Sequence, residues 1–241
     1  MNRFDASLSL KGVFTAGNRK PTLILLLTPV LLTTFKYYGA KSFYLAKIAP
    51  SLHLLPNPQE AAAYYHFFSS LVLFGAIPLL IVRFVFREPF AAYGLQIGDW
   101  RFGLKAVALL APVMILAAFP ASRMPQFRAE YPVFGGAGGP DGAFLAYSAA
   151  YLTYYVGWEM FFRGFMQFGL RGAFGDWNAI LVQTIASCLI HIGKPDGEIF
   201  GAILAGIVWG LVAFRSRSIL YVLILHWLLG TSLDLFIVSA R

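Results

Sequence analysis

The sequence predicts an all-α protein, a polytopic bundle of about seven transmembrane helices, with eight as the alternative. Of its 241 residues, 59% are hydrophobic and 12% are charged, whereas an average soluble domain has about twice that charged fraction. Several apolar runs reach the roughly 20 residues that a helix needs to cross a bilayer. We therefore expect an integral, multi-pass protein of the cell (plasma) membrane, with the lipid bilayer as its constant partner.

The expected spans follow the apolar runs in chain order. Each run is long enough, and poor enough in charge, to cross the hydrocarbon core. The runs are 21–38, 62–86, 103–120, 143–170, 177–193, 198–214 and 218–238. The segment between the first two is interrupted by Pro50, Pro56 and Pro58, so we expect an interfacial helix there, followed by a turn.

A glycine-rich connector, which ends in GGAGGPDG, divides the chain into a front and a back part. We expect a polar N-terminal tail (1–20), three front helices (21–130), a flexible linker (131–142) and a four-helix core (143–238). Lys and Arg are more frequent in the connections that share a side with the N-terminus. This bias predicts a cytoplasmic N-terminus.

The net charge of +8 fits a membrane protein and does not indicate nucleic-acid binding. Basic residues collect beside the anionic cytoplasmic leaflet, and the sequence has no run of five or six of them. The single cysteine, Cys188, excludes an intrachain disulfide. We therefore expect no nucleic-acid partner and no disulfide partner.

The back part places ionisable side chains at membrane depth, where they are costly and by default serve a function or face the interior of a bundle. They are Glu159, Arg163, His191, His226 and Asp234, with Glu198 at the start of the sixth helix. The front part offers little besides His66. This asymmetry predicts that any chemistry lies within 143–238.

Several of these residues also have a purely structural interpretation. Glu159 and Arg163 are four residues apart, so they share a helix face and can neutralise each other as a buried ion pair. Glu198, in a first helical turn, can stabilise the helix dipole. His226 and Asp234 are about two turns apart and face roughly the same way.

Small residues recur at helical spacing along the sixth helix. They are Gly197, Gly201, Ala205 or Gly206, and Gly210. Such a stripe lets helix backbones approach closely in lipid. We expect it to serve packing and to take no part in chemistry.

One glutamate and two histidines can support two kinds of hydrolysis. Glu159, His191 and His226 can bind one divalent metal, such as zinc, that activates water. Alternatively, Glu and His polarise the water without a metal while a His holds the oxyanion. A GxSxG elbow, a glycine-rich phosphate loop and an HExxH motif are all absent from the sequence.

Three segments of the back part resemble the motifs of the CPBP family, the CAAX proteases and bacteriocin-processing enzymes. The family motifs are EExxxR, FxxxH and HxxxN or HxxxD, in that order. The matching segments are WEMFFRG (158–164), SCLIH (187–191) and HWLLG (226–230). The resemblance covers 143–238 and implies an intramembrane endopeptidase.

Position by position, the second glutamate of the EExxxR motif corresponds to Glu159 and the arginine of that motif to Arg163. The histidines of the other two motifs correspond to His191 and His226. The resemblance implies that Glu159 and His191 activate the attacking water. It also implies that His226 stabilises the oxyanion or binds a metal.

The sequence departs from the family pattern at three positions. Trp158 stands where the EExxxR motif has its first glutamate, Ser187 replaces the phenylalanine of the second motif, and Gly230 replaces the final Asn or Asp. Asp234, one turn further on, can replace the lost polar group, and Glu198 can supply a second carboxylate.

These observations favour a peptidase that hydrolyses a protein or peptide at the membrane, by CAAX-type or bacteriocin-type processing. An inactive family member, acting as a scaffold or immunity factor, is the first alternative. A transporter whose buried Glu, His and Asp relay protons is the second. For Glu159 and His191 to meet, the fifth helix must tilt or the GKPDG segment (193–197) must lie within a cavity.

Overall fold

The computed structural model describes residue 15 and residues 17–52, 54–138 and 143–240, and every regular element within them is a helix. Six helical stretches are long and apolar enough to cross a membrane. The chain is thus an integral, multi-pass membrane protein of the all-α class, as the sequence predicts. Most of the expected N-terminal tail (1–14 and 16) and the end of the expected linker (139–142) lie outside the described residues.

The front part begins with α3 (Arg19–Tyr38) and the short α4 (Lys41–Phe43), which runs on into the π-helix η1 (Tyr44–Ile48). This short helical segment (41–48) lies where the sequence predicts an interfacial helix. The second span is one continuous stretch of four pieces: α5 (Pro58–Ser70), η2 (Leu71–Ala76), α6 (Ile77–Leu80) and η3 (Ile81–Phe86). Asn57 caps it by accepting hydrogen bonds from the backbone N–H groups of Gln59 and Glu60.

After a 3₁₀ turn, η4 (Phe90–Tyr93), the third span is α7 (Trp100–Ala121), whose first turn is capped by the Asp99 carboxylate. The connection to the back part contains a short helix, α8 (Pro125–Glu130), and a second 3₁₀ turn, η5 (Gly135–Gly138). The side chain of Lys41 donates a hydrogen bond to the carbonyl of Val133, and this bond attaches the connection to the front part.

The back part consists of α9 (Ala143–Glu159), the π-helix η6 (Met160–Phe168), α10 (Gly169–Ile190), α11 (Asp196–Ser216) and α12 (Leu220–Val238). The stretch Ala143–Ile190 counts as one of the six candidate spans but is interrupted at Gly175, where φ is 72° and ψ is 174°. The chain changes direction there, and the last part of α10 packs beside η6. The break explains why the sequence predicts about seven spans.

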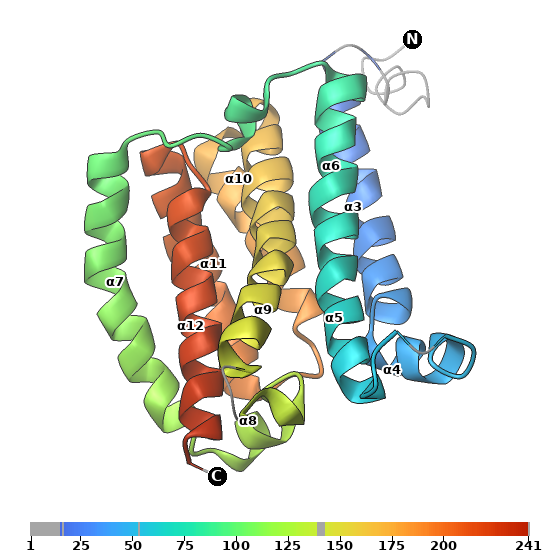
Figure 1. Ribbon diagram of the computed structural model, residues 1–241. Coiled ribbons are helices and arrows are strands. Elements are labelled where there is room, and N and C mark those ends of the chain that lie inside the picture. Colours follow the sequence, from blue (N-terminus) through green and yellow to red (C-terminus); the bar gives the residue numbers. More distant parts are fainter. Residues whose placement is uncertain (1–14, 16, 53, 139–142, 241) are drawn as a thin grey trace.

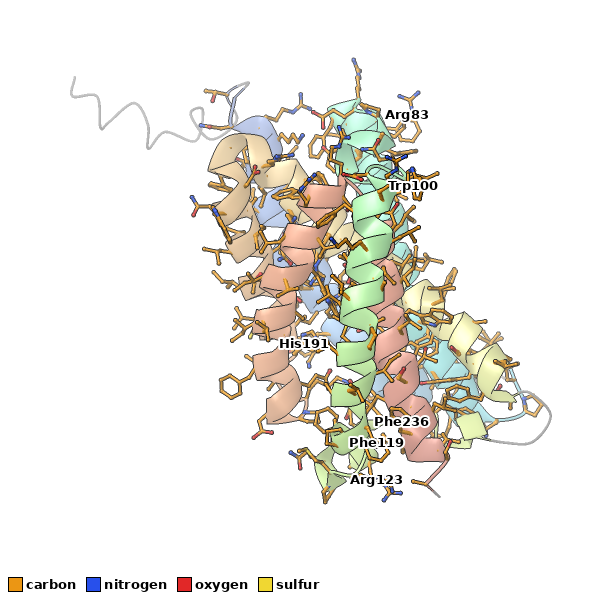
Figure 2. All side chains as sticks on the ribbon, turned by 90° about the vertical axis from the view of Figure 1, so that its left-hand side faces the viewer. Arg83, Trp100, Phe119, Arg123, His191 and Phe236 are labelled. Carbon is orange, nitrogen blue, oxygen red and sulfur yellow. The ribbon has the colours of Figure 1, made fainter. Side chains whose placement is uncertain are left out.

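The front helices flank the back part on two sides, as Figure 1 shows. On one side α7 packs along α12, while on the other α5 and η2 pack against α9, and α3 packs against α10. Figure 2 looks at the α7 side and labels His191 partway along the bundle, between Trp100 and Arg123. The residue at the end of α10 therefore lies partway along the length of the bundle and not at one of its two ends.

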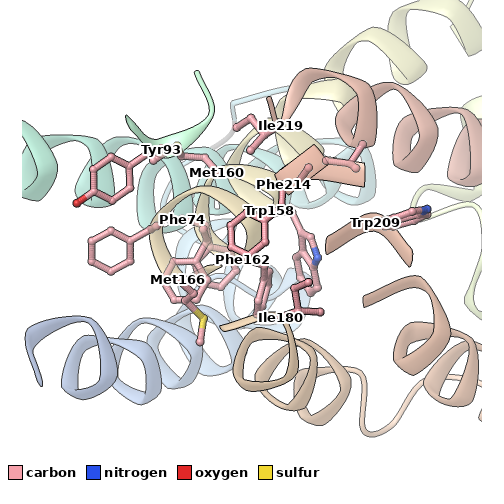
Figure 3. Close-up of a cluster of buried hydrophobic side chains, with 14 of the residues drawn as sticks. Phe74, Tyr93, Trp158, Met160, Phe162, Met166, Ile180, Trp209, Phe214 and Ile219 are labelled. Carbon is pink, nitrogen blue, oxygen red and sulfur yellow. The ribbon is translucent and has the colours of Figure 1, made fainter. Parts of the chain in front are cut away.

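Aromatic side chains pack in the bundle between η2, α9 and η6. The rings of Phe74 and Phe161 stack with 4.8 Å between centroids, and Trp158 packs 4.8 Å from Phe162. Figure 3 shows Phe74, Trp158 and Phe162 among the converging side chains. This packing fixes the end of α9, which carries Glu159.

The stripe of small residues on α11 divides into two parts. A Cβ added at Gly206 would lie 2.6 Å from the Thr184 hydroxyl, so this glycine allows α11 and α10 to pack closely, as the sequence predicts. Gly201 has no atom within 4 Å of an added Cβ, and Gly197 and Gly201 both line a cavity. At this end an added Cβ at Gly197 would lie 3.8 Å from the Phe127 ring, an ordinary packing distance, so only Gly201 lacks a packing neighbour.

Candidate active site

Two cavities meet at the ionisable side chains of the back part. The first has a volume of about 270 Å³ and lies between α7, α11 and α12, with mostly apolar walls. The second has a volume of about 400 Å³, and Lys36, Lys41 and Lys194 are among its lining residues. The residues common to both cavities are Tyr131, Tyr155, His191, Glu198 and His226. Polar groups capable of acid–base chemistry thus lie where the two cavities adjoin.

Glu159 is fully buried at the end of α9 and lines neither of these cavities. Its Oε1 lies 3.2 Å from the Arg163 guanidinium and 2.6 Å from His226 Nδ1. The expected pair of Glu159 and Arg163 is therefore formed, and His226 joins it. Because the carboxylate only accepts hydrogen bonds, His226 Nδ1 carries the proton in this contact.

His226 is held by tilted contacts with two aromatic rings as well as by Glu159. Its ring centroid lies 4.5 Å from that of Tyr155 on one helix and 4.5 Å from that of Trp209 on another. With Nδ1 bound to Glu159, the second ring nitrogen, Nε2, is the one available for a substrate. A carboxylate that orients a histidine in this way also stabilises the imidazolium form.

His191 follows the last residue of α10 and has a separate partner. Its Nδ1 donates to the carbonyl of Ser187 at 2.5 Å, one helical turn earlier, so Nε2 again is the free nitrogen. Nε2 lies 3.8 Å from Glu198 Oε1. His191, Lys194, Gly197 and Glu198 line the cavities, so the segment after α10 lies at their walls, as expected from the sequence.

Glu198 lies in the first turn of α11, where the sequence places it near the helix dipole. The Tyr131 hydroxyl donates a hydrogen bond to Glu198 Oε1 at 2.7 Å. Oε2 is buried and has no hydrogen-bond partner among the described residues. Since a buried acceptor without a partner is costly, Oε2 is suited to a ligand or a water.

Trp158 stands where the EExxxR motif of the CPBP family, which the sequence resembles, has its first glutamate. Its ring lies 5.3 Å from that of His191 and 6.4 Å from that of His226, and the residue is 3% exposed. An apolar ring therefore lies beside both histidines, where the family motif would supply a carboxylate. The nearest carboxylate to His191 comes instead from α11.

Asp234, the expected replacement for the motif Asn, is fully buried and accepts a hydrogen bond from Tyr147 at 2.8 Å. It is not among the lining residues of either cavity. Tyr147 in turn accepts a hydrogen bond from the backbone N–H of Val133, which ties α9 and α12 to the connection after α8. These contacts link Asp234 to the framework of the bundle.

The described residues do not fit a metal site. No group of three or more His, Cys, Asp or Glu side chains among them is arranged to hold a metal ion. Glu159 is engaged by Arg163 and His226, whereas His191 faces Glu198. The ligand set expected from Glu159, His191 and His226 is therefore not assembled among the described residues.

Tyr131 and Tyr155 are site residues that were not predicted from the sequence. Tyr155 lies one turn before Glu159, so its position on the same helix face was a usable signal. Tyr131 comes from the connection between the two parts, and its sequence context gives no such signal. Its role follows only from the fold, which brings it to Glu198.

Comparison with models of protein families matches residues 140–231 to the Rce1-like family, described as type II CAAX prenyl endopeptidase Rce1-like. This range contains α9, η6, α10 and α11 and ends within α12. It includes Glu159, His191, Glu198 and His226. No curated protein and no solved structure matches the chain.

Proposed function

The chain belongs, through residues 140–231, to the CPBP family of CAAX-type proteases, and from this premise we propose that it is an active intramembrane endopeptidase. Its substrate is a peptide bond of a protein or peptide held at the bilayer. The observation that carries the proposal is the approach of His191 Nε2 and Glu198 Oε1 at the junction of the two cavities.

We assign activation of the water to His191 and Glu198. Both facing atoms are acceptors when His191 is neutral, since its proton is on Nδ1. Two acceptors 3.8 Å apart can be bridged by one water that donates a hydrogen to each. A water held in this way has its lone pairs directed away from the carboxylate and toward a substrate.

Glu198 thus takes the role that the sequence analysis gave to Glu159. Glu159 lines neither cavity, and its Oε1 is already bound by a guanidinium and an imidazole. In this proposal Glu159 is a positioning residue that acts through His226. It holds the Nδ1–H of His226, and in this proposal His226 carries a second proton at Nε2 when the substrate is bound.

The steps balance without a further reactant. The water attacks the scissile carbonyl carbon as His191 Nε2 takes its proton, and the carbonyl oxygen becomes an oxyanion. His226 Nε2–H donates a hydrogen bond to that oxyanion. When the C–N bond breaks, His191 returns its proton to the leaving amine, and the products are a carboxylic acid and an amine.

The two cavities give the substrate and the water different routes. Small and apolar residues of α7 and α11 surround the first cavity and suit an apolar chain from the lipid. They are Ala117, Ala118, Ala121, Gly197, Gly201, Ala202 and Ala205. The lysine-lined second cavity is the polar side, from which water reaches His191.

The test is cleavage of a prenylated peptide with a C-terminal CAAX sequence by the purified chain in lipid vesicles. We expect Glu198→Gln and His191→Gln each to lower kcat by about 100-fold or more, the usual contribution of acid–base groups. Glu60→Gln, in the first turn of α5, is the matched control and should leave kcat unchanged. Full activity of Glu198→Gln would refute the assignment.

An inactive family member is the second candidate, and the position of Trp158 favours it. The ring lies beside both histidines where the family motif has a carboxylate. An inactive protein would bind the same peptide in vesicles without releasing product. Its peptide affinity would be insensitive to Glu198→Gln.

A further inference from the structure

The space beside Gly230 is filled by the hydroxyl of Tyr155. A Cβ added at Gly230 would lie 1.9 Å from Tyr155 Oη and 2.9 Å from its Cζ. No side chain larger than hydrogen fits at position 230 while Tyr155 keeps this position. The phenol from α9 therefore occupies the space that a side chain on α12 would otherwise take.

This hydroxyl is also at the candidate active site. Tyr155 and Gly230 both line the first cavity, together with His226. The Tyr155 ring packs against the His226 ring at 4.5 Å, and Gly230 lies one helical turn after His226. Tyr155 is only 4% exposed, so its hydroxyl is held in place by the surrounding side chains.

We propose that the Tyr155 hydroxyl is a catalytic residue that donates a hydrogen bond to the oxyanion, alongside His226. The proposal rests on the hydrolase function proposed above. A phenol carries one O–H donor and remains protonated near neutral pH, so it can donate without any proton leaving it. The tetrahedral intermediate then has two donors from two helices, α9 and α12.

Packing alone does not account for the hydroxyl. The ring of Tyr155 contacts Tyr151 at 4.6 Å and His226 at 4.5 Å, and a phenylalanine would keep both ring contacts while losing the hydrogen-bond interaction of the hydroxyl with Tyr151. The oxygen adds a close approach to the Cα of Gly230, which is possible only because position 230 is a glycine. A hydrogen-bond donor that is already oriented toward the oxyanion in a buried site stabilises the transition state far more than the same donor in water.

The first experiment compares Tyr155→Phe with the wild type in vesicles by two measurements. We expect kcat for the prenylated peptide to fall about 100-fold or more with KM within about threefold, as for loss of one oxyanion donor. We also expect the Kd of a phosphonate analogue of the peptide to rise by a similar factor, while the Kd of the peptide itself stays within about threefold. Tyr44→Phe, a buried tyrosine that lines neither cavity, is the matched control.

The two measurements separate this inference from the proposed function. If His191→Gln abolishes cleavage but Tyr155→Phe cleaves and binds the phosphonate like the wild type, the proposed function stands and the role of Tyr155 is refuted. If the wild type cleaves nothing, the proposed function fails. Phosphonate binding still tests the role of Tyr155 in that case. If the wild type binds the phosphonate more tightly than the peptide and Tyr155→Phe loses this difference, the donor role is supported. If the two proteins bind the phosphonate equally well, the donor role is refuted.

A second set of variants tests the place of the hydroxyl. Gly230→Asn alone should be inactive, because its Cβ overlaps Tyr155 Oη. Tyr155→Leu frees that space but removes the donor. In the double variant Tyr155→Leu/Gly230→Asn, the amide can donate from the α12 side, so we expect at least about tenfold recovery of kcat over Tyr155→Leu. Absence of any recovery would contradict a donor role at this place.

Discussion

At the scale of single residues, Glu159, Arg163 and His226 form a buried charge cluster beside the candidate site, and Arg163 and His226 line the first cavity. Arg163 is 1% exposed, Glu159 is 0% exposed, and the guanidinium also lies 5.4 Å from the Trp209 ring. A buried ion pair costs desolvation, so it is weak evidence for stability, but removing one partner leaves an uncompensated charge. The cluster therefore fixes His226 at the expense of tolerance to mutation.

We predict that Arg163→Met lowers the free energy of unfolding by about 3–5 kcal/mol, because it leaves the Glu159 carboxylate buried beside His226 alone. The double variant Arg163→Met/Glu159→Gln should recover part of this loss. Thermal unfolding in detergent measures both. Arg171→Met is the control: its pair with Asp176 is about half exposed, and such pairs contribute about 1 kcal/mol or less. Equal effects of the two Arg→Met changes would contradict a buried structural pair.

At the scale of elements, the separation of the fourth and fifth spans depends on one glycine. Gly175 has φ of 72° and ψ of 174°, a backbone conformation that is almost restricted to glycine. An added Cβ there meets no atom within 4 Å, so any cost of a substitution comes from the backbone alone. The exposed ion pair of Arg171 and Asp176 lies at the same turn.

Gly175→Ala should therefore destabilise the protein by about 1–3 kcal/mol. Gly172→Ala is a close control, since Gly172 is helical and an added Cβ there also meets no atom within 4 Å. We expect that change to be neutral or to stabilise by up to about 1 kcal/mol, as for Gly→Ala in an exposed helix. Denaturant or thermal unfolding distinguishes the two, and equal effects would mean that the turn does not need glycine.

The elements were predictable because hydropathy and length alone define spans. The sequence predicts separate spans at 143–170 and 177–193, and the break at Gly175 lies between them. Other local features were not predictable. The π-helical geometry of η6 directly follows Glu159 and carries Arg163, and no residue pattern in that segment indicates it.

At the scale of the whole molecule, the candidate residues were predictable but their partners were not. Three separated motifs indicated Glu159, His191 and His226. The contacts of Glu198 with His191 and of Tyr155 with Gly230 join different helices, so they depend on how the bundle packs. The sequence indicates Glu198 only as a helix-dipole residue or a second carboxylate.

The whole-molecule arrangement also predicts how an apolar substrate reaches the site. Residues of α7 and α11 line the first cavity, and Gly201 leaves open space there, whereas Gly206 further along α11 touches Thr184. A leucine at 201 would extend into the cavity without displacing a neighbour. A leucine at 206 would overlap the α10 helix.

We therefore expect Gly201→Leu to raise KM for a prenylated peptide by about tenfold or more, while the free energy of unfolding changes by less than about 1 kcal/mol. Gly206→Leu should instead lower stability by about 1–3 kcal/mol or more through overpacking. Kinetics in vesicles and thermal unfolding in detergent give the two quantities for each variant. If Gly201→Leu cleaves the peptide with unchanged KM, the substrate does not pass between α7 and α11. The lysine-lined second cavity would then have to admit both peptide and water.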